Sequence, residues 1–237
     1  RKAKILIKSL RRRVRRPGMI LSDHAPIQES PWCQSVENLK IKITENNLAK
    51  SRLVRPLGPE IYLTHDVDTR DCYEAIPEIT RLEQQSGIRS VYFFLTGWEY
   101  PFDPALARNL DSDGFEVGMH GLTHDLAIGY RPNQSIENHI QQALDQLEIP
   151  AVGYRAPAFA ISEPLFRALE KFNFLYDSSL HMWHPMYPSS GVIFPYHYPS
   201  STLLEVPLSI EDSMLFDDFR FTSRQALMFI EKTLEMI

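Results

Sequence analysis

Cysteines and long hydrophobic runs are scarce in this sequence of 237 residues. The longest apolar run, Val91–Leu95, is far shorter than the roughly 20 residues that a membrane-spanning helix needs. Two cysteines, Cys33 and Cys72, are too few for a disulfide framework and are typical of a reducing compartment. No apolar signal segment stands near the start, although a first residue of Arg1 leaves a removed leader open. We therefore expect a soluble, cytoplasmic protein.

Basic residues are also scarce beyond the first sixteen positions. Nine of the 25 Lys and Arg lie in residues 1–16, which leaves 16 basic against 30 acidic residues in the remainder. A nucleic-acid ligand requires a basic surface on the folded domain, so the acidic body argues against one.

The chain is expected to have three parts. Residues 1–16 carry an apolar residue at every fourth position among their basic residues, which predicts an amphipathic helix. Such a helix suits peripheral contact with an anionic membrane, here the inner face, or with a partner; the alternative is that its stripe packs on its own domain. Residues 17–59 form a proline-punctuated extension with an edge strand at Leu39–Ile43, and the main domain covers residues 60–237.

From residue 60 short apolar runs alternate with helical patterns, which predicts an α/β fold with a parallel sheet, either open or closed into a barrel. A strand-like segment at 203–210 and a helix from Ser223 follow. The expected strands are 61–63, 91–95, 115–119, 151–154 and 174–176, and the expected helices are 72–86, 104–111, 135–147 and 163–172.

Polar side chains stand at four of the expected strand ends. Asp66 and Asp68 follow the first strand, two histidines at i and i+4 follow the third, Arg155 follows the fourth and Asp177 the fifth. Taken singly, the acids suit helix caps, the arginine suits a surface ion pair, and a histidine pair on a helical turn arises often by chance. Ligands of parallel α/β folds bind at the carboxyl ends of the strands, so their common position predicts one site.

This ordered set resembles the polysaccharide deacetylases of carbohydrate esterase family 4, also called the NodB homology domain, over about residues 60–210. Thr64–Asp68 is similar to the family's Thr-Phe-Asp-Asp-Gly motif, in a variant with one residue between the acids. Gly114–His120 with His124 resembles the second motif. Arg155–Ala158 matches Arg-x-Pro-aromatic except at its last position, and Asp177 followed by Trp183 looks like a loose fourth motif. The resemblance implies a distorted (β/α) barrel of the NodB deacetylase type with a non-barrel N-terminal extension.

The resemblance also implies roles for individual residues. Asp68, His120 and His124 would hold one divalent metal ion, which the family's pattern implies to be Zn²⁺, with open positions for water and substrate. Asp66 would be the general base, and Arg155 would keep it ionised. The backbone N–H of Ala158 would stabilise the oxyanion, and Asp177 would be a further catalytic residue. Expected substrate contacts are His65 and four aromatic residues of the proline-rich loop 181–200, Trp183, Tyr187, Tyr196 and Tyr198; the alternative for that loop is a stiff cover of the barrel mouth.

The sequence departs from the family pattern at three points. His65 replaces an aromatic residue beside the base, and Gly121 replaces the Ser or Thr that usually follows the first metal histidine. The last motif, a Leu-x-His whose histidine protonates the leaving amine, is not found before Ile237. Either this motif lies in residues beyond the given chain, so that the barrel is incomplete at its C-terminus, or His181, His184 or His197 has to replace it. His24 and His139 are expected to be ordinary loop and helix-surface residues.

The expected function is metal-dependent removal of an acetyl group from an N-acetylated sugar in a polysaccharide, O-antigen or lipopolysaccharide precursor. One alternative is a hydrolase of another non-peptide C–N bond in a small molecule, for which a closed pocket would be expected. A second is a catalytically incompetent carbohydrate-binding relative. A metal-free glycosidase is disfavoured because it would leave both metal histidines without a role. The sequence gives neither the sugar nor the oligomeric state.

Overall fold

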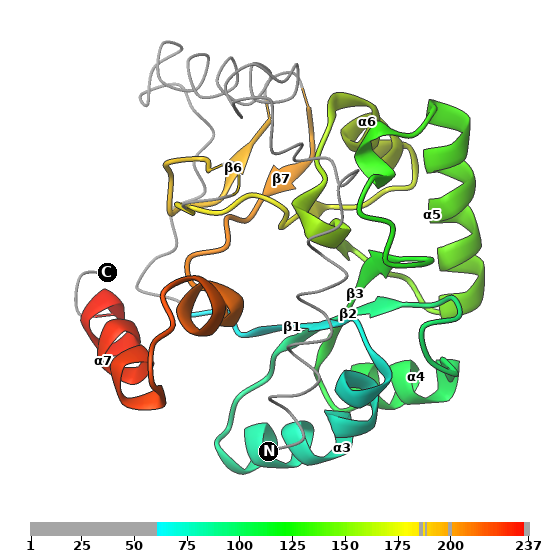
Figure 1. Ribbon diagram of the computed structural model, residues 1–237. Coiled ribbons are helices and arrows are strands. Elements are labelled where there is room, and N and C mark those ends of the chain that lie inside the picture. Colours follow the sequence, from blue (N-terminus) through cyan, green and yellow to red (C-terminus); the bar gives the residue numbers. More distant parts are fainter. Residues whose placement is uncertain (1–60, 185–186, 188, 199–200, 235–237) are drawn as a thin grey trace.

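The computed structural model describes residues 61–184, 187, 189–198 and 201–234 (Figure 1). The basic helix expected at 1–16 and the extension 17–59, with its strand at Leu39–Ile43, lie outside these residues. Within the described ranges, no helix combines the length and the apolar character that crossing a bilayer requires.

Seven strands form one sheet, in the order β1-β2-β3-β4-β5-β7-β6. The pairs from β1 to β5 and the pair β5–β7 are parallel, and β6 runs antiparallel to β7. The predicted α/β barrel type of fold is confirmed. The strands are β1 Thr64–Val67, β2 Val91–Leu95, β3 Glu116–Gly121, β4 Gly153–Tyr154, β5 Tyr176–Asp177, β6 Tyr196–His197 and β7 Leu204–Glu205.

Helices follow β1 to β4 and pack along the sheet, as Figure 1 shows for α3 to α6. In α5 the residues Ile136, Ile140, Ala143 and Leu147 are buried at helical spacing, which gives that helix one apolar face. The helices are α3 Arg70–Gln85, α4 Pro104–Ser112, α5 Asn133–Leu147, α6 Glu163–Lys171 and α7 Ser223–Leu234, with short helical turns at η2 Ile128–Tyr130, η3 Pro157–Phe159 and η4 Met214–Asp218.

The N-cap residue of α3 is Thr69, whose side chain accepts the N–H of Cys72. A capping role for Asp68 is therefore excluded, and its carboxylate is available for another purpose. The expected first strand at 61–63 is wrong, because those three side chains are exposed and pairing with β2 starts at Thr64. Asp66 is consequently part of β1, and Asp68 is the residue that directly follows the strand.

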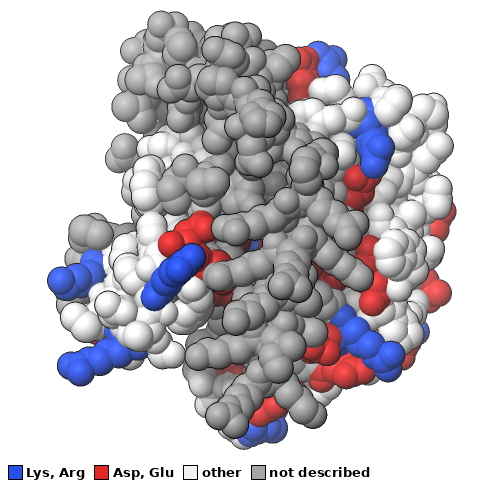
Figure 2. All heavy atoms as spheres, in the orientation of Figure 1, with Lys and Arg blue, Asp and Glu red and all other residues white. Residues whose placement is uncertain are grey.

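The main core lies between the sheet and α3 to α6, and a smaller apolar cluster lies beneath α7. Of the strand expected over 203–210, β7 covers two residues, and Leu208 pairs further along the chain with His181 in an isolated parallel bridge. On the face seen in Figure 2, the described Lys and Arg side chains lie at isolated points and form no continuous basic patch. This distribution is consistent with the acidic balance of the sequence.

Candidate active site

Alternation along β1 separates the side chains of its motif. Asp66 and Asp68 point to one side, whereas His65 points to the other, where its Nε2 lies 2.8 Å from Oε1 of Glu83. The imidazole also stacks on Tyr92 at 4.7 Å between ring centroids. The expectation that His65 contacts substrate beside the base is thus corrected, because His65 joins the strand to α3.

Asp68, His120 and His124 come together at the ends of β1 and β3, with ligand atoms all within 4.8 Å of one another. Asp68 Oδ1 lies 3.0 Å from Nε2 of His120 and 3.6 Å from Nε2 of His124. This oxygen is buried and has no hydrogen-bond partner among the described residues. A buried acceptor without a donor is costly, and a cation at this point would satisfy it.

The ring of His120 is oriented for a metal ion. Its Nδ1 lies 2.7 Å from the backbone carbonyl of Arg155, so Nδ1 carries the proton that it donates there. In the neutral ring Nε2 then offers a lone pair toward Asp68. Metal-binding histidines commonly donate their second ring N–H to a carbonyl in this way. The residues present therefore fit a divalent metal ion.

The charges around the cluster favour a positive ion. Burial by itself would raise the pKa of Asp68, but the imidazole of His120 and the nearby cationic groups lower it overall. Burial would lower the pKa of His120, yet the carboxylates of Asp66 and Asp68 raise it. For His124 burial dominates and lowers the pKa, which keeps its imidazole neutral. A metal ion would supply the positive charge that the carboxylates of Asp66 and Asp68 favour at this point.

The histidine pair is not on a helical turn, as the i, i+4 spacing had indicated. His120 is a strand residue, and the β2–β3 register shifts there by one residue, which is a bulge that re-aims a side chain. Gly121 then has φ 133°, a conformation that favours glycine, and a Cβ at this position would lie 2.8 Å from His139 Nε2. The chain turns after this glycine and brings His124 back to the cluster. The conformation of position 121 and the nearby His139 ring explain why glycine stands where the family pattern has Ser or Thr.

His139 has a role that the sequence did not reveal. Its Nε2 accepts the backbone N–H of Leu122 at 2.8 Å, so a residue of α5 holds the loop between the two metal-site histidines. The expectation of an ordinary helix-surface residue is wrong. Glu99, in the loop after β2, holds the same loop from the other side by accepting the N–H of His124 at 2.7 Å.

Arg155 is only 2% exposed, which excludes the alternative of a surface ion pair. Its Nη1 donates to Asp66 Oδ1 at 2.8 Å and to Thr64 Oγ1 at 2.9 Å. The other nitrogens donate to the carbonyl and hydroxyl of Ser178, at 2.9 and 2.8 Å, and the guanidinium lies over the Phe93 ring. Thr64 and Ser178 are positioning residues that the motif comparison missed.

Ala158, the last residue of the arginine motif after β4, lies in η3 with φ 51° and ψ 25°. This left-handed conformation is unusual for a residue with a Cβ, and such strained positions cluster at functional sites. The role of its N–H in stabilising an oxyanion stays a prediction.

Asp177 does not reach the site that it was expected to serve. It is fully buried and pairs with the fully buried Glu205 of β7, and burial raises the pKa of Asp177 to about 6. The pKa of Glu205 is raised well above its usual value by burial and by the charge of Asp177. Asp177 accepts a hydrogen bond from Ser179, whose Oγ in turn accepts the N–H of Ala156. This buried position does not fit the expected direct catalytic role; through Ser179, Asp177 contacts the backbone of Ala156, the residue after Arg155.

The aromatic loop contributes fewer contacts to substrate than expected. Tyr196 and Tyr198 are buried in the main core, so a sugar ring cannot stack on them. Tyr187 packs on the rings of His181 and His184. Trp183 is 54% exposed and lies beside Phe219, which leaves it as the accessible aromatic residue of the expected set.

His181, His184 and Glu211 form a second cluster, which differs from the first in the ring nitrogen that carries the histidine proton. His181 Nε2 lies 2.8 Å from Glu211 Oε2. His184 Nδ1 accepts the N–H of Tyr187, so the proton of its neutral ring is on Nε2, which faces Glu211 and Asp218. A protonated ring nitrogen cannot bind a metal ion, and this cluster is therefore suited to holding protons. The third candidate, His197, instead contacts the carbonyl of Thr202 in the edge region.

A comparison with protein families identifies the family of this chain. Residues 54–176, just over half of the sequence, match the family model described as polysaccharide deacetylase, and the chain belongs to this family. None of the curated proteins compared with the chain matches it significantly.

Solved structures share the fold at low sequence identity. A putative polysaccharide deacetylase from Mycobacterium smegmatis aligns with a TM-score of 0.51 and 20% identity, over 68% of this chain and 64% of that chain. A probable polysaccharide deacetylase from Pseudomonas aeruginosa PAO1 aligns with a TM-score of 0.54 and 18% identity, over 68% and 54%. Puue allantoinase aligns with a TM-score of 0.50 and 18% identity, over 68% and 56%. The chain thus spans between about half and two thirds of the length of these proteins.

Proposed function

We propose that this protein is a metal-dependent hydrolase that removes the acetyl group from an N-acetylated sugar. The observation that carries the proposal is that Asp66 and Asp68, two positions apart in the chain, have different partners. Asp66 is paired with Arg155, whereas Asp68 faces two histidines with a buried oxygen that lacks a donor. One acid is held as an anion that can accept a proton, and the other completes a set of ligands.

Asp68, His120 and His124 would hold the ion, which by this ligand set is best assigned as zinc. When bound, the metal would polarise the amide carbonyl and lower the pKa of a water molecule. Three protein ligands are the usual number for a catalytic zinc site, which leaves a position open to the substrate. The roles of the remaining residues concern the protons and the developing charge.

Asp66 takes a proton from the attacking water as the water oxygen bonds to the acetyl carbon. Arg155 orients this carboxylate through its 2.8 Å hydrogen bond. The carbonyl oxygen becomes an oxyanion, and the N–H of Ala158 donates to it. The C–N bond then breaks, acetate leaves and the sugar nitrogen takes up a proton to depart as an amine.

His181, paired with Glu211, is the proposed donor of that last proton. Its ring lies 4.2 Å from the ring of Phe159, the residue after Ala158, which supports a place beside the oxyanion. Burial and the charge of Glu211 raise the pKa of Asp212, and the charge of Asp66 adds to this effect. Segment 211–212 is therefore within electrostatic reach of the base.

The finer assignment of the substrate rests on the sequence. The low cysteine content suits a reducing compartment, and the basic segment 1–16 suits the inner surface of a membrane. Together they support a precursor of a surface glycan, such as an O-antigen or lipopolysaccharide intermediate, rather than a finished polymer.

The test is acetate release from N-acetyl sugars, nucleotide sugars and lipid-linked glycans, with metal content measured on the same preparation. We expect one metal ion per chain and acetate release that stops on chelation and resumes on adding Zn²⁺. Hydrolysis of allantoin without acetate release from any sugar would favour the small-molecule alternative. Metal binding with no turnover at all would favour the non-catalytic relative.

A further inference from the structure

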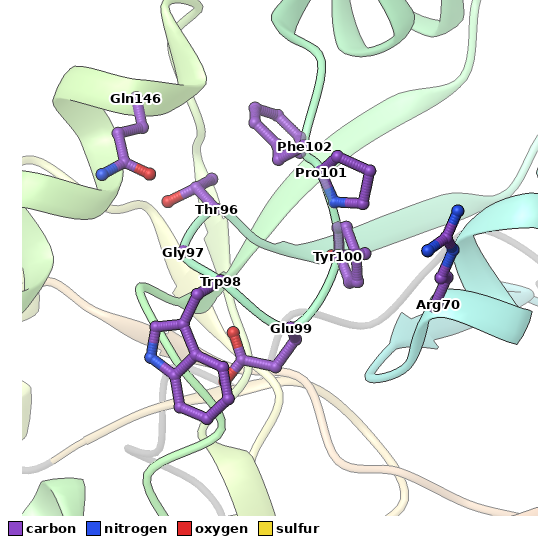
Figure 3. A pocket seen from close by; sticks show the side chains of 9 residues that line it. All are labelled: Arg70, Thr96, Gly97, Trp98, Glu99, Tyr100, Pro101, Phe102 and Gln146. Atoms are coloured by element: carbon purple, nitrogen blue, oxygen red, sulfur yellow. The ribbon is translucent and has the colours of Figure 1, made fainter.

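An exposed tryptophan stands at the end of β2, outside the loop in which sequence comparison placed the sugar contacts. Trp98 is 82% exposed, more than any other large hydrophobic residue named on the described surface. It belongs to the loop Thr96–Phe102, which lines a hollow of about 560 Å³. That volume is in the usual range of small-molecule sites. Figure 3 shows the loop flanked by Gln146 from α5 and by Arg70 from α3.

The loop that presents Trp98 is held firmly from below. Tyr100 is buried, its hydroxyl donates to the carbonyl of Val67 at the end of β1, and it accepts the N–H of Leu95 at the end of β2. Its ring stacks on Tyr73 at 4.5 Å. On the other side, Thr96 donates to the carbonyl of Ala143 in α5. The indole is therefore exposed on a fixed support rather than on a loose loop, which limits the entropy lost when a ligand binds.

The hollow adjoins the proposed metal site. Glu99 lines it, and the same side chain accepts the backbone N–H of His124 at 2.7 Å. Arg70 also lines it and follows Asp68 by two residues at the start of α3. A ligand that fills the hollow is thus next to a group bound at Asp68 and the two histidines.

The chemistry of the lining suits a saccharide. The face of an indole packs on the apolar C–H face of a sugar ring, while Arg70 and Gln146 offer hydrogen-bond donors and acceptors for hydroxyl groups. A closed apolar pocket, which the small-molecule alternative requires, is not what these residues form.

We infer that this hollow is a saccharide subsite, in which Trp98 stacks on the sugar next to the one that is deacetylated. The inference rests on the proposed function and narrows it, because it requires a substrate of at least two sugar units. Trp98 is then a specificity residue that acts on oligosaccharide affinity rather than on bond cleavage.

The test compares Trp98→Ala and the conservative Trp98→Phe with the wild type, using triacetylchitotriose and N-acetylglucosamine as probes. Binding is followed by tryptophan fluorescence and by calorimetry, neither of which requires turnover. We expect the Kd and KM for the trisaccharide to rise roughly five- to tenfold in Trp98→Ala relative to those for the monosaccharide, with kcat within about twofold. Trp98→Phe should recover part of the affinity. Leu227→Ala, which removes an exposed apolar side chain from α7, is the matched control and should change neither constant.

The outcomes separate this inference from the proposed function. Trisaccharide binding that depends on Trp98, without acetate release, would support the subsite and contradict the function. Acetate release with equal affinities in the wild type and Trp98→Ala would support the function and overturn the subsite. Absence of both binding and turnover with either probe would overturn the subsite as well.

Discussion

Arg155 Nη1 lies 2.8 Å from Asp66 Oδ1, while the backbone carbonyl of the same arginine accepts the Nδ1 proton of His120 at 2.7 Å. One residue of β4's strand end therefore orients both the proposed base and a proposed metal ligand. Its side chain orients the carboxylate of the acid, and its main chain fixes which nitrogen of the imidazole faces Asp68. Arg155 therefore connects the proposed base to the proposed metal site.

Substitution by asparagine should have different effects on metal binding and turnover at Asp66 and at Asp68. Asp66→Asn keeps the size of the side chain but cannot accept a proton, so metal should stay while turnover falls about 10²- to 10⁴-fold. Asp68→Asn removes an anionic ligand, so metal affinity should fall first, and excess metal should restore part of the activity. Metal analysis and acetate release on the same preparations decide between them. Loss of metal from Asp66→Asn with retention by Asp68→Asn would reverse the two roles.

The protein should bind one metal ion rather than two, although the described residues contain two histidine clusters. His120→Ala should remove the ion, since a site of three protein ligands cannot spare one. His184→Ala should leave the metal content unchanged, because the proton on Nε2 of that ring prevents coordination. Elemental analysis after dialysis against Zn²⁺ gives the stoichiometry. A second equivalent that disappears in His184→Ala would show that the tautomer assignment is wrong.

His139 should affect metal binding without being a ligand. His139→Ala leaves the N–H of Leu122 without its acceptor and frees the loop between His120 and His124. Loss of an outer partner of this kind typically costs about 10- to 100-fold in metal affinity. Competition with a chromogenic chelator measures the change, and His139→Gln, which retains an acceptor, should recover part of it. Equal zinc affinity in His139→Ala and the wild type would limit this histidine to folding alone.

The Asp177–Glu205 pair should make stability depend on pH. The pKa of Asp177 is about 6 in the folded protein, above its ordinary value of 3.8, so the native state binds a proton that the unfolded chain has lost. The free energy of unfolding should therefore fall as pH rises from about 4 through 6, by at most about 1.4 kcal/mol per pH unit for one proton.

Asp177→Asn should remove most of this slope, because its amide can donate to Glu205 without titrating. Urea unfolding at several pH values in the presence of chelator measures the free energy in both proteins. If the variant retained the same slope as the wild type, another group would be responsible.

Much of the domain followed from local patterns in the sequence. β2 and the helices α4 to α6 lie within about two residues of their predicted positions, because apolar periodicity and capping residues act over short distances. The clustering of Asp68 with His120 and His124 was also predictable. Parallel strands bring their carboxyl ends to one edge, whatever the exact contacts between them.

The tertiary structure decided everything that depends on residues far apart in the chain. The sequence showed a histidine beside Asp66, but the pleat of β1 turned His65 toward Glu83. It showed an i, i+4 pair, but a bulge in β3 and the φ of Gly121, with His139 against it, placed His124. The burial of Tyr196 and Tyr198, and the bond from Arg155 to Thr64 across 91 positions, likewise arise from packing between elements. Local propensity determines which elements form, whereas the direction, exposure and protonation of their side chains depend on the neighbours that only folding supplies.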